Sequence, residues 1–201
     1  MPIFKKRTQH ATWFNTDEHF NELYPPSVQV HARRHWTPLG VARKAARFLS
    51  AEDHSRILDI GSGVGKFCLA AACYYPAAFY FGVEQRKSLT VHAEGAKEIL
   101  GCKNVQFLHG NFTQADFRNY DHFYFYNSFF ENISEGDKID EHIDYSGELY
   151  NYYTRYLFKQ LEKKPAGTRL ATFHSLEDEV PKDFHTVGSE MDDLLKFWIK
   201  V

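Results

Sequence analysis

Residues 59–66 read Asp-Ile-Gly-Ser-Gly-Val-Gly-Lys, and this stretch decides the fold. It continues the short apolar run Arg-Ile-Leu-Asp-Ile at 56–60, which is typical of a buried strand. Glycine at positions 61, 63 and 65 allows the backbone to turn sharply and to pass close to a ligand. The mostly apolar residues that follow predict a helix to about residue 75. The pattern therefore predicts a strand, a glycine-rich turn and a helix.

Strands and helices alternate outward from this unit. Further strands are expected at 78–83, 105–109, 122–127 and 168–174, and further helices at 37–50, 88–100 and 148–163. Two last strands, near 184–187 and 194–201, are too close in sequence for a crossover helix, so they predict an antiparallel hairpin. The alternation predicts an α/β protein with a Rossmann-like, doubly wound, mostly parallel seven-stranded sheet. Ligands bind such sheets beyond the carboxyl ends of the strands, which makes the residues after each strand the candidate site.

The glycine loop itself narrows the class of ligand. A P-loop would need glycine at position 60 and Ser or Thr at 67, where this chain has Ile60 and Phe67. The dinucleotide fingerprint would need a third glycine at the position of Lys66, and its pyrophosphate would be repelled by Asp59. A ligand that carries positive charge and no phosphate, such as S-adenosylmethionine, fits better. A carboxylate that only braces the turn, and a nicotinamide dehydrogenase, remain alternatives.

The other strand ends add polar and aromatic candidates. Glu84 follows the second strand and can accept hydrogen bonds from both ribose hydroxyls, or can simply cap the next helix. Asn111 and Phe112 follow the third strand, where an amide can meet the adenine edge and a ring can stack on it. Tyr126, Asn127 and Phe129 follow the fourth strand and are the candidates for holding the methyl acceptor, with an ordinary helix cap as the alternative.

The composition of the chain limits the cellular compartment and the partners that we expect. The chain has 201 residues, a net charge of −2 and three cysteines, none of which has metal-ligand spacing. An uneven cysteine count favours a reducing, cytoplasmic setting. We expect no metal site, no secretory signal and no membrane span, because the longest uncharged run, 67–83, is short and contains Pro76.

The first 50 residues look helical and mildly basic. Thr37 and Pro38 predict a helix start, with a capping hydroxyl followed by a proline at the first helical position. We therefore expect residues 1–36 to be an N-terminal helical segment, a candidate lid, and residues 37–201 to be the ligand-binding domain. Eight basic residues lie in this part of the chain: Lys5, Lys6, Arg7, Arg33, Arg34, Arg43, Lys44 and Arg47.

The motifs EDHSRILDIGSGVGKFCLAAA (52–72), FGVEQ (81–85) and HGNF (109–112) together resemble class I S-adenosylmethionine-dependent methyltransferases. The resemblance covers roughly residues 37–201. It implies that S-adenosyl-L-methionine is the cofactor. It also implies which of the candidate residues bind the methionine moiety, the ribose and the adenine. The residues implied to bind the cofactor are Asp59, Gly61, Gly63 and Gly65 for the methionine moiety, Glu84 for the ribose, Asn111 and Phe112 for the adenine, and, without an assigned moiety, Ser62, Gln85 and Thr37.

The class of acceptor is less defined. A similarity to the non-SET histone-lysine methyltransferases is carried by the motifs DIGSGVGKF, GVEQ and YNSFF. The N/D-P-P-Y motif, which is typical of DNA and glutamine-amide methylation, would need prolines at 128–129. This chain has none there, which argues against those two acceptors. The acidic stretch 131–148 would border the acceptor and attract a cation, or would simply be a solvated loop. We expect an amine acceptor, on a protein lysine or a small molecule, and consider nucleic acid less favoured. An RNA methyltransferase, supported by the basic first 50 residues, and a non-catalytic cofactor-binding protein are the alternatives. For methyl transfer from a sulfonium, orientation is the main contribution expected of the protein, and a base is needed only if the acceptor arrives protonated.

Overall fold

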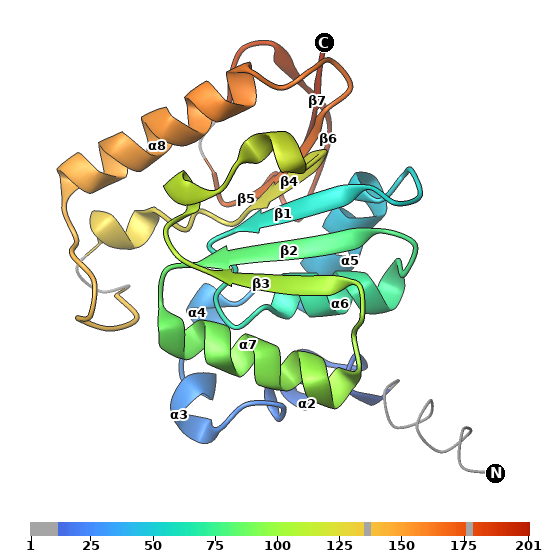
Figure 1. Cartoon of the computed structure of the whole chain (residues 1–201), viewed down its shortest axis with the longest axis vertical. Helices are drawn as coiled ribbons and strands as arrows, with labels where there is room; N and C mark the ends of the chain where they lie inside the picture. The colour runs from blue at the N-terminus through green and yellow to red at the C-terminus, as the bar shows by residue number, and fades with distance from the viewer. Residues whose placement is uncertain (1–11, 135–137, 176–178) are drawn as a thin grey trace.

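The computed structural model describes residues 12–134, 138–175 and 179–201. Its centre is a seven-stranded sheet in the order β3-β2-β1-β4-β5-β7-β6 (Figure 1). The strands are β1 (Arg56–Ile60), β2 (Phe79–Glu84), β3 (Val105–His109), β4 (His122–Phe125), β5 (Arg169–Phe173), β6 (Phe184–Glu190) and β7 (Leu195–Lys200). The first five strands pair in parallel, and β7 is antiparallel to both β5 and β6. The predicted Rossmann-like sheet and its terminal hairpin are confirmed.

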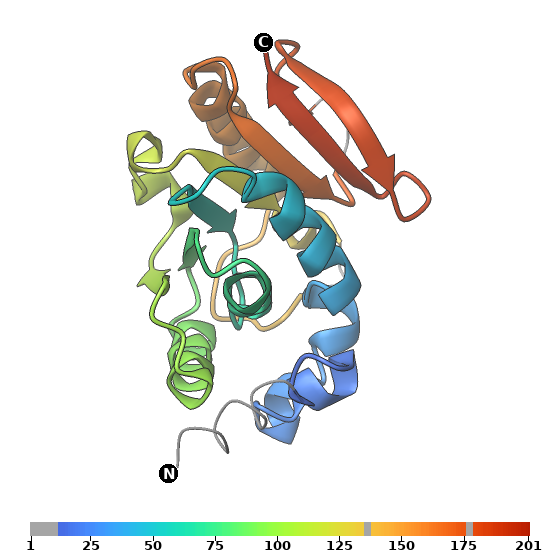
Figure 2. The same ribbon diagram turned by 90° about the vertical axis from the view of Figure 1, so that its right-hand side faces the viewer.

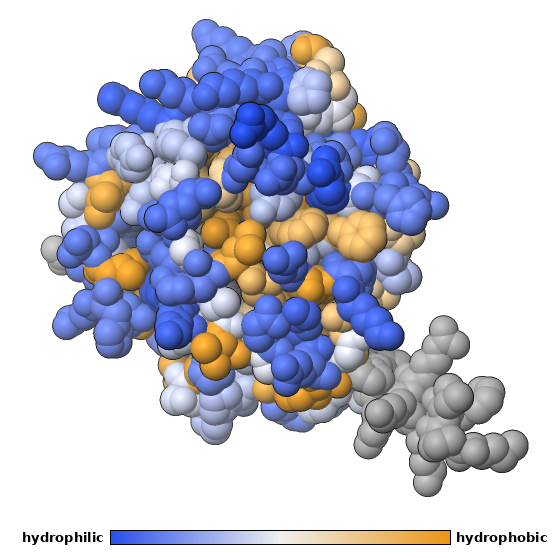
Figure 3. All heavy atoms as spheres, viewed as in Figure 1, coloured by the Kyte–Doolittle hydropathy of each residue, from blue (hydrophilic) through white to orange (hydrophobic). Residues whose placement is uncertain are grey.

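Helices cover the two faces of the sheet unequally. The helices α5 (Leu39–Leu49), α6 (Lys66–Tyr74) and α7 (Lys87–Leu100) lie on one face, with α5 beside β5 and β7 (Figure 2). The other face carries α8 (Gly147–Glu162) and the short 3-10 helices η1 (Phe112–Gln114), η2 (Phe117–Asn119) and η3 (Phe130–Asn132). Since η1 and η2 replace a crossover helix, Phe81 and Leu108 remain only partly buried, and apolar side chains show on this side (Figure 3).

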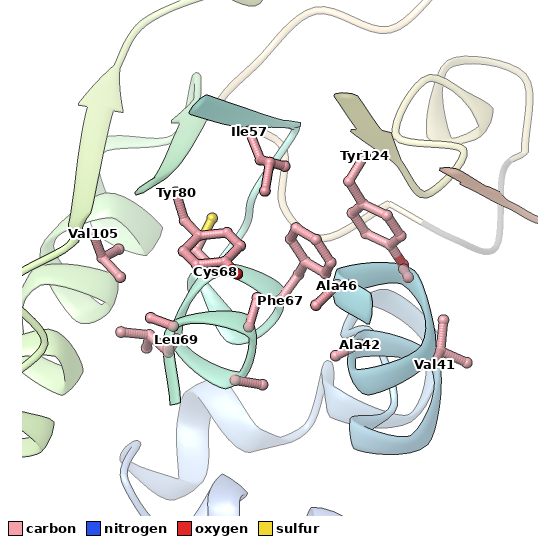
Figure 4. Close-up of a cluster of buried hydrophobic side chains, with 14 of the residues drawn as sticks. Val41, Ala42, Ala46, Ile57, Phe67, Cys68, Leu69, Tyr80, Val105 and Tyr124 are labelled. Carbon is pink, nitrogen blue, oxygen red and sulfur yellow. The ribbon is translucent and has the colours of Figure 1, made fainter. Parts of the chain in front are cut away.

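The core on the side of α5, α6 and α7 is built from aromatic and small side chains (Figure 4). The rings of Phe67 and Tyr124 stack with centroids 3.9 Å apart and planes 11° from parallel. Alternate residues of β1 enter different cores, Ile57 on this face and Leu58 on the other, and both are fully buried. Each such side chain contributes about 1.5–3 kcal/mol of burial, so β1 is fixed in place from both sides.

The described part of the N-terminal segment packs into the same core. It forms three short helices, α2 (Asp17–Asn21), α3 (Pro26–Gln29) and α4 (Ala32–His35). Phe20, Tyr24 and Trp36 are buried in the cluster of the α5–α7 face, and the Tyr24 hydroxyl donates to the carbonyl of Val64, 2.9 Å away in the glycine loop. The predicted cap of the next helix is wrong. Helix α5 begins at Leu39, and its first N–H donates to Asp17 Oδ1 over 3.0 Å.

Thr37 therefore does not cap α5. Its hydroxyl pairs with the Tyr124 hydroxyl at 3.1 Å instead. The fourth strand was expected to reach Asn127, but β4 ends at Phe125, because Asn127 adopts a left-handed φ of 30° that no strand can contain. The other expected elements end within a few residues of the observed ones. Lys5, Lys6 and Arg7 lie outside the described residues. Among the residues that the structure describes, no helix is long and apolar enough to cross a membrane.

Candidate active site

A cavity of about 650 Å³ lies at the carboxyl ends of β1, β2 and β4, as the topology rule requires. It contains the expected site residues except Gly65. The residues that line it are Thr37, Asp59, Gly61, Ser62, Gly63, Glu84, Gln85, Asn111, Phe112, Tyr126, Asn127 and Phe129, together with others that the sequence did not indicate. Segments that are far apart in the chain therefore meet at this edge of the sheet.

The three glycines of the loop have different roles. All have positive φ, of 76°, 54° and 82° at Gly61, Gly63 and Gly65. A Cβ on Gly63 would meet nothing within 4 Å, so this residue faces open space in the cavity. A Cβ on Gly65 would lie 2.3 Å from the Phe107 ring, so Gly65 serves packing against the sheet.

Asp59 is a buried carboxyl group at the floor of the cavity. Its residue is 4% exposed, and the Cys68 thiol donates to Oδ2 over 3.7 Å. Burial raises the pKa of Asp59 from 3.8 to about 8, an effect that the Cys68 contact opposes and the charge of Glu84 reinforces. A cation placed beside this group would restore its charged form. An ammonium group is therefore the kind of ligand that this position favours.

Glu84 is held with its carboxylate toward the glycine loop. Gly63 N–H donates to Oε2 over 3.0 Å, and Arg86 N–H donates to Oε1 over 2.8 Å. Burial raises the pKa of Glu84, while these two N–H donors and the Arg86 charge lower it. Each carboxylate oxygen retains an acceptor position, so the group is oriented and can still accept from a pair of hydroxyls.

Asn111 and Phe112 form the wall at the end of β3. Asn111 Oδ1 accepts from the N–H and hydroxyl of Thr113, and Nδ2 donates to the Tyr153 hydroxyl over 2.8 Å. The Phe112 ring stacks on Phe129 with centroids 4.9 Å apart. Both residues line the cavity, yet their side chains are engaged within the protein. Together with Phe129 they give the cavity a wall that contains aromatic rings, the kind of surface on which a purine ring can lie.

The residues after β4 form the other side of the cavity. The Tyr126 hydroxyl donates to the Arg34 carbonyl over 3.0 Å, and its ring packs on Phe173 and His174. Asn127 has its left-handed backbone here, and its Oδ1 is buried with no hydrogen-bond partner among the described residues. Strained backbone and an unpaired carbonyl oxygen are features that persist at functional sites. Phe129 is only 4% exposed and is part of the wall.

Several residues that line the cavity were not predicted from the sequence. Helix α4 brings His31, Arg33, Arg34 and His35 to its rim, and Phe130 stands 43% exposed there. The basic character of the N-terminal segment was visible in the sequence, but its position above the site was not. Arg86 was missed altogether, and it binds Glu131 and Asp140 of the acidic stretch through charge contacts of 2.7 and 3.3 Å. No group of three metal-ligating side chains occurs among the described residues.

The cavity fits S-adenosylmethionine on its own chemistry. A buried carboxyl group that a cation would ionise is available to an ammonium group, an oriented carboxylate can accept from a pair of hydroxyls, and aromatic rings line the wall at the end of β3. Gly63 leaves open the space that any side chain would fill. With the strand order 3-2-1-4-5-7-6, these features define a class I S-adenosylmethionine-dependent methyltransferase.

Comparison with known proteins supports this class. Residues 51–187 match the family model described as a methyltransferase domain, and the chain belongs to this family. It is similar to a tRNA (guanine-N(7)-)-methyltransferase of Microcystis aeruginosa, with 31% identity over 97 residues that cover 44% of this chain and 45% of that protein. A protein of the same name from Synechococcus sp. is 35% identical over 94 residues, 47% of this chain and 36% of that one. The chain thus aligns with less than half the length of these relatives.

Solved structures resemble the fold. An RNA methyltransferase from Salinibacter ruber, in complex with S-adenosyl-L-homocysteine, has a TM-score of 0.56 at 20% identity and covers 82% of this chain and 92% of its own. TrmN from Thermus thermophilus has a TM-score of 0.57 at 20% identity, over 87% of this chain and 52% of its own. At this identity the likeness concerns the fold alone.

Proposed function

We propose that the chain is an RNA methyltransferase that uses S-adenosylmethionine, with the N7 atom of a tRNA guanine as the first candidate acceptor. The names of the similar curated proteins support this choice of atom. It differs from the amine acceptor that the sequence favoured. The residues that we propose to bind the cofactor are those given above, except Gly65, which packs against the sheet.

The observation that carries the proposal is the charge at the rim of the cavity. Arg33 and Arg34 of α4 are both exposed there, where phosphate groups of an RNA backbone could be bound. Phe130, 43% exposed on the same rim, offers a ring on which an unstacked base could lie. The N-terminal segment 1–36, expected as a candidate lid, thereby contributes a wall of the acceptor site through α4.

The chemistry asks little of the protein beyond orientation. When bound, S-adenosylmethionine supplies a methyl group whose bond to sulfur breaks as a bond to the acceptor nitrogen forms, with the positive charge passing to the acceptor. Guanine N7 has a lone pair and no proton, so the chain needs no general base for it. Asn127 and Tyr126 would orient the base, and the Tyr126 ring would favour the cationic product through its π face.

An amine acceptor is the second candidate, because part of the acidic stretch is exposed. Glu141, Asp144 and Glu148 are open to solvent and could attract a lysine or a polyamine. Two other members of the stretch, Glu131 and Asp140, are already paired with Arg86, which reduces the field available to a cation. A cytoplasmic setting remains part of the proposal, since Cys68, Cys73 and Cys102 are free thiols.

The test offers methyl-labelled S-adenosylmethionine with three acceptors in parallel: total tRNA that lacks 7-methylguanosine, a core-histone mixture and a polyamine. We expect label in tRNA, and 7-methylguanosine after digestion to nucleosides. Glu84→Ala is the inactive control, because it removes the ribose contact. Label in histones or polyamine but not in tRNA would establish the amine alternative. Cofactor binding by calorimetry with no label in any acceptor would favour the non-catalytic alternative.

A further inference from the structure

Arg86 is a buried cation that neither the fold nor the proposed chemistry explains. It is the residue before α7, two positions after Glu84, and its side chain is 4% exposed. Its N–H donates to Glu84 Oε1 over 2.8 Å, and Nη1 lies 3.7 Å from the same oxygen. A buried guanidinium is stable only when its donors find acceptors or anions. Arg86 is therefore attached to the carboxylate proposed to bind the ribose.

The other partners that the structure describes for the Arg86 guanidinium come from the segment between β4 and α8. Nη2 donates to Glu131 Oε2 over 2.7 Å and to the Tyr145 hydroxyl over 2.8 Å. Nε lies 3.3 Å from Asp140 Oδ2. The Tyr145 hydroxyl in turn donates to the Asp140 carbonyl over 2.6 Å. One guanidinium thus fixes both described ends of a segment that borders the acceptor side of the cavity.

The charges in this cluster are unequal. Three carboxyl groups, of Glu84, Glu131 and Asp140, share a single guanidinium, and Arg86 can approach one of them only by giving up part of its contact with another. In a network of this kind the energy of one contact depends on the state of the others. A change on the segment should therefore be felt at Glu84.

We infer that Arg86 is a positioning residue that couples the ribose site to Glu131, Asp140 and Tyr145, so that cofactor binding and the order of residues 138–145 depend on one another. The inference rests on the proposed role of Glu84. Removing the Glu131 charge would leave Arg86 free to move onto Glu84, where it competes with the ribose hydroxyls. Without Arg86, the same removal only relieves repulsion of the Glu84 carboxylate.

A double-mutant cycle on cofactor affinity tests the coupling. The dissociation constant of S-adenosylmethionine is measured by calorimetry, without acceptor, for the unmodified chain, Glu131→Gln, Arg86→Met and the double variant. We expect Glu131→Gln to weaken binding about three- to tenfold in the unmodified chain and to leave it unchanged or tighter in the Arg86→Met background. Glu141→Gln removes the same charge from an exposed position of the segment and should have no effect. Equal weakening in both backgrounds would overturn the inference.

Tyr145→Phe covers the case that Arg86→Met does not fold. It removes one oxygen from Arg86, and Tyr145 does not line the cavity, so direct contact with the cofactor does not confuse the result. We expect this variant to weaken binding at least about twofold and to speed amide hydrogen exchange in 138–145 in the cofactor-bound state. Unchanged affinity and exchange would refute the coupling. Because no RNA is present, failure of tRNA methylation and failure of the coupling are separate results.

Discussion

Asp59 determines how the site responds to pH. Its pKa rises from 3.8 to about 8 on folding, so the folded chain binds this proton more tightly than the unfolded chain does. The free energy of unfolding contributed by Asp59 therefore falls as pH rises from about 4 to about 8. A cationic ligand favours the deprotonated group, so its affinity should increase over the same range.

Asp59→Asn should therefore raise the melting temperature of the cofactor-free protein at pH 8, on the order of 5 °C, while weakening S-adenosylmethionine binding at least about tenfold. Scanning calorimetry and titration calorimetry at pH 6, 7 and 8 measure both quantities. Asp53→Asn, an exposed counterpart on the preceding loop, should change neither. A variant that is less stable than the unmodified chain at pH 8 would contradict this assignment.

Two glycines of the same loop are predicted to have different roles, Gly63 in cofactor binding and Gly65 in packing. Alanine at either position is strained by the positive φ, at a cost of about 1–2 kcal/mol. At Gly65 the methyl group would also collide with Phe107, so we expect Gly65→Ala to lose about 2–4 kcal/mol of unfolding free energy. Gly63→Ala should lose less stability but more cofactor affinity, since its methyl group enters the cavity.

Urea unfolding and cofactor titration of the two glycine variants provide the measurement. Phe107→Leu should recover part of the loss in Gly65→Ala, because it removes the ring atoms that the new Cβ would meet. Similar stability of the two alanine variants would show that Gly65 does not serve packing.

At the scale of elements, α2 holds the start of α5 and the end of the glycine loop together. Asp17 Oδ1 accepts from the Leu39 N–H and lies 2.6 Å from Lys66 Nζ. Lys66 is 3% exposed, and burial lowers its pKa, an effect that Asp17 opposes. Asp17→Ala would leave this ammonium with Asn21 as a neutral partner and α5 without its cap.

We expect Asp17→Ala to lower the unfolding free energy by about 1–3 kcal/mol, with Asp17 itself partly open to solvent. Asp17→Asn keeps an acceptor for the Leu39 N–H and should lose less. Urea unfolding at pH 7 measures both, and Glu22→Ala, at the exposed residue that follows α2, is the control. Equal losses in the alanine and asparagine variants would mean that the whole effect comes from the charge on Asp17 and that the acceptor for the Leu39 N–H adds nothing.

The same elements show how far the sequence could be interpreted. Apolar runs predicted all seven strands, and the topology rule then placed Asp59 and Glu84 at one edge of the sheet. The predicted cap of α5 was wrong, because the acceptor for the Leu39 N–H is Asp17, a residue 22 positions before Leu39. The end of β4 was misplaced, because a left-handed Asn127 depends on its three-dimensional surroundings. Arg86 and the rim of α4 owe their roles to packing between distant segments, which no local pattern records.

At the scale of the whole molecule, the positive rim predicts a salt-dependent interaction. If Arg33 and Arg34 each meet one phosphate, then Arg33→Gln/Arg34→Gln should reduce the slope of log affinity against log salt by about 2 and weaken tRNA binding about tenfold or more. Filter binding between 50 and 200 mM salt measures this slope.

Lys103→Gln/Lys163→Gln is the matched control for that measurement. Both lysines are exposed, and they lie just before β3 and just after α8, away from the carboxyl ends of the strands. It removes the same charge and should leave the slope nearly unchanged. Equal loss in the two double variants would show that tRNA responds to net charge and has no preferred surface on this protein.

The strand order also has a consequence for biosynthesis. Within the part of the chain that the structure describes, β6 pairs with β7 alone, while β7 also pairs with β5. A ribosome makes β6 first, so this strand has no place in the sheet until β7 has been translated and has left the exit tunnel. Until then, the edge of the nascent sheet on this side is β5, an exposed strand that a chaperone could protect.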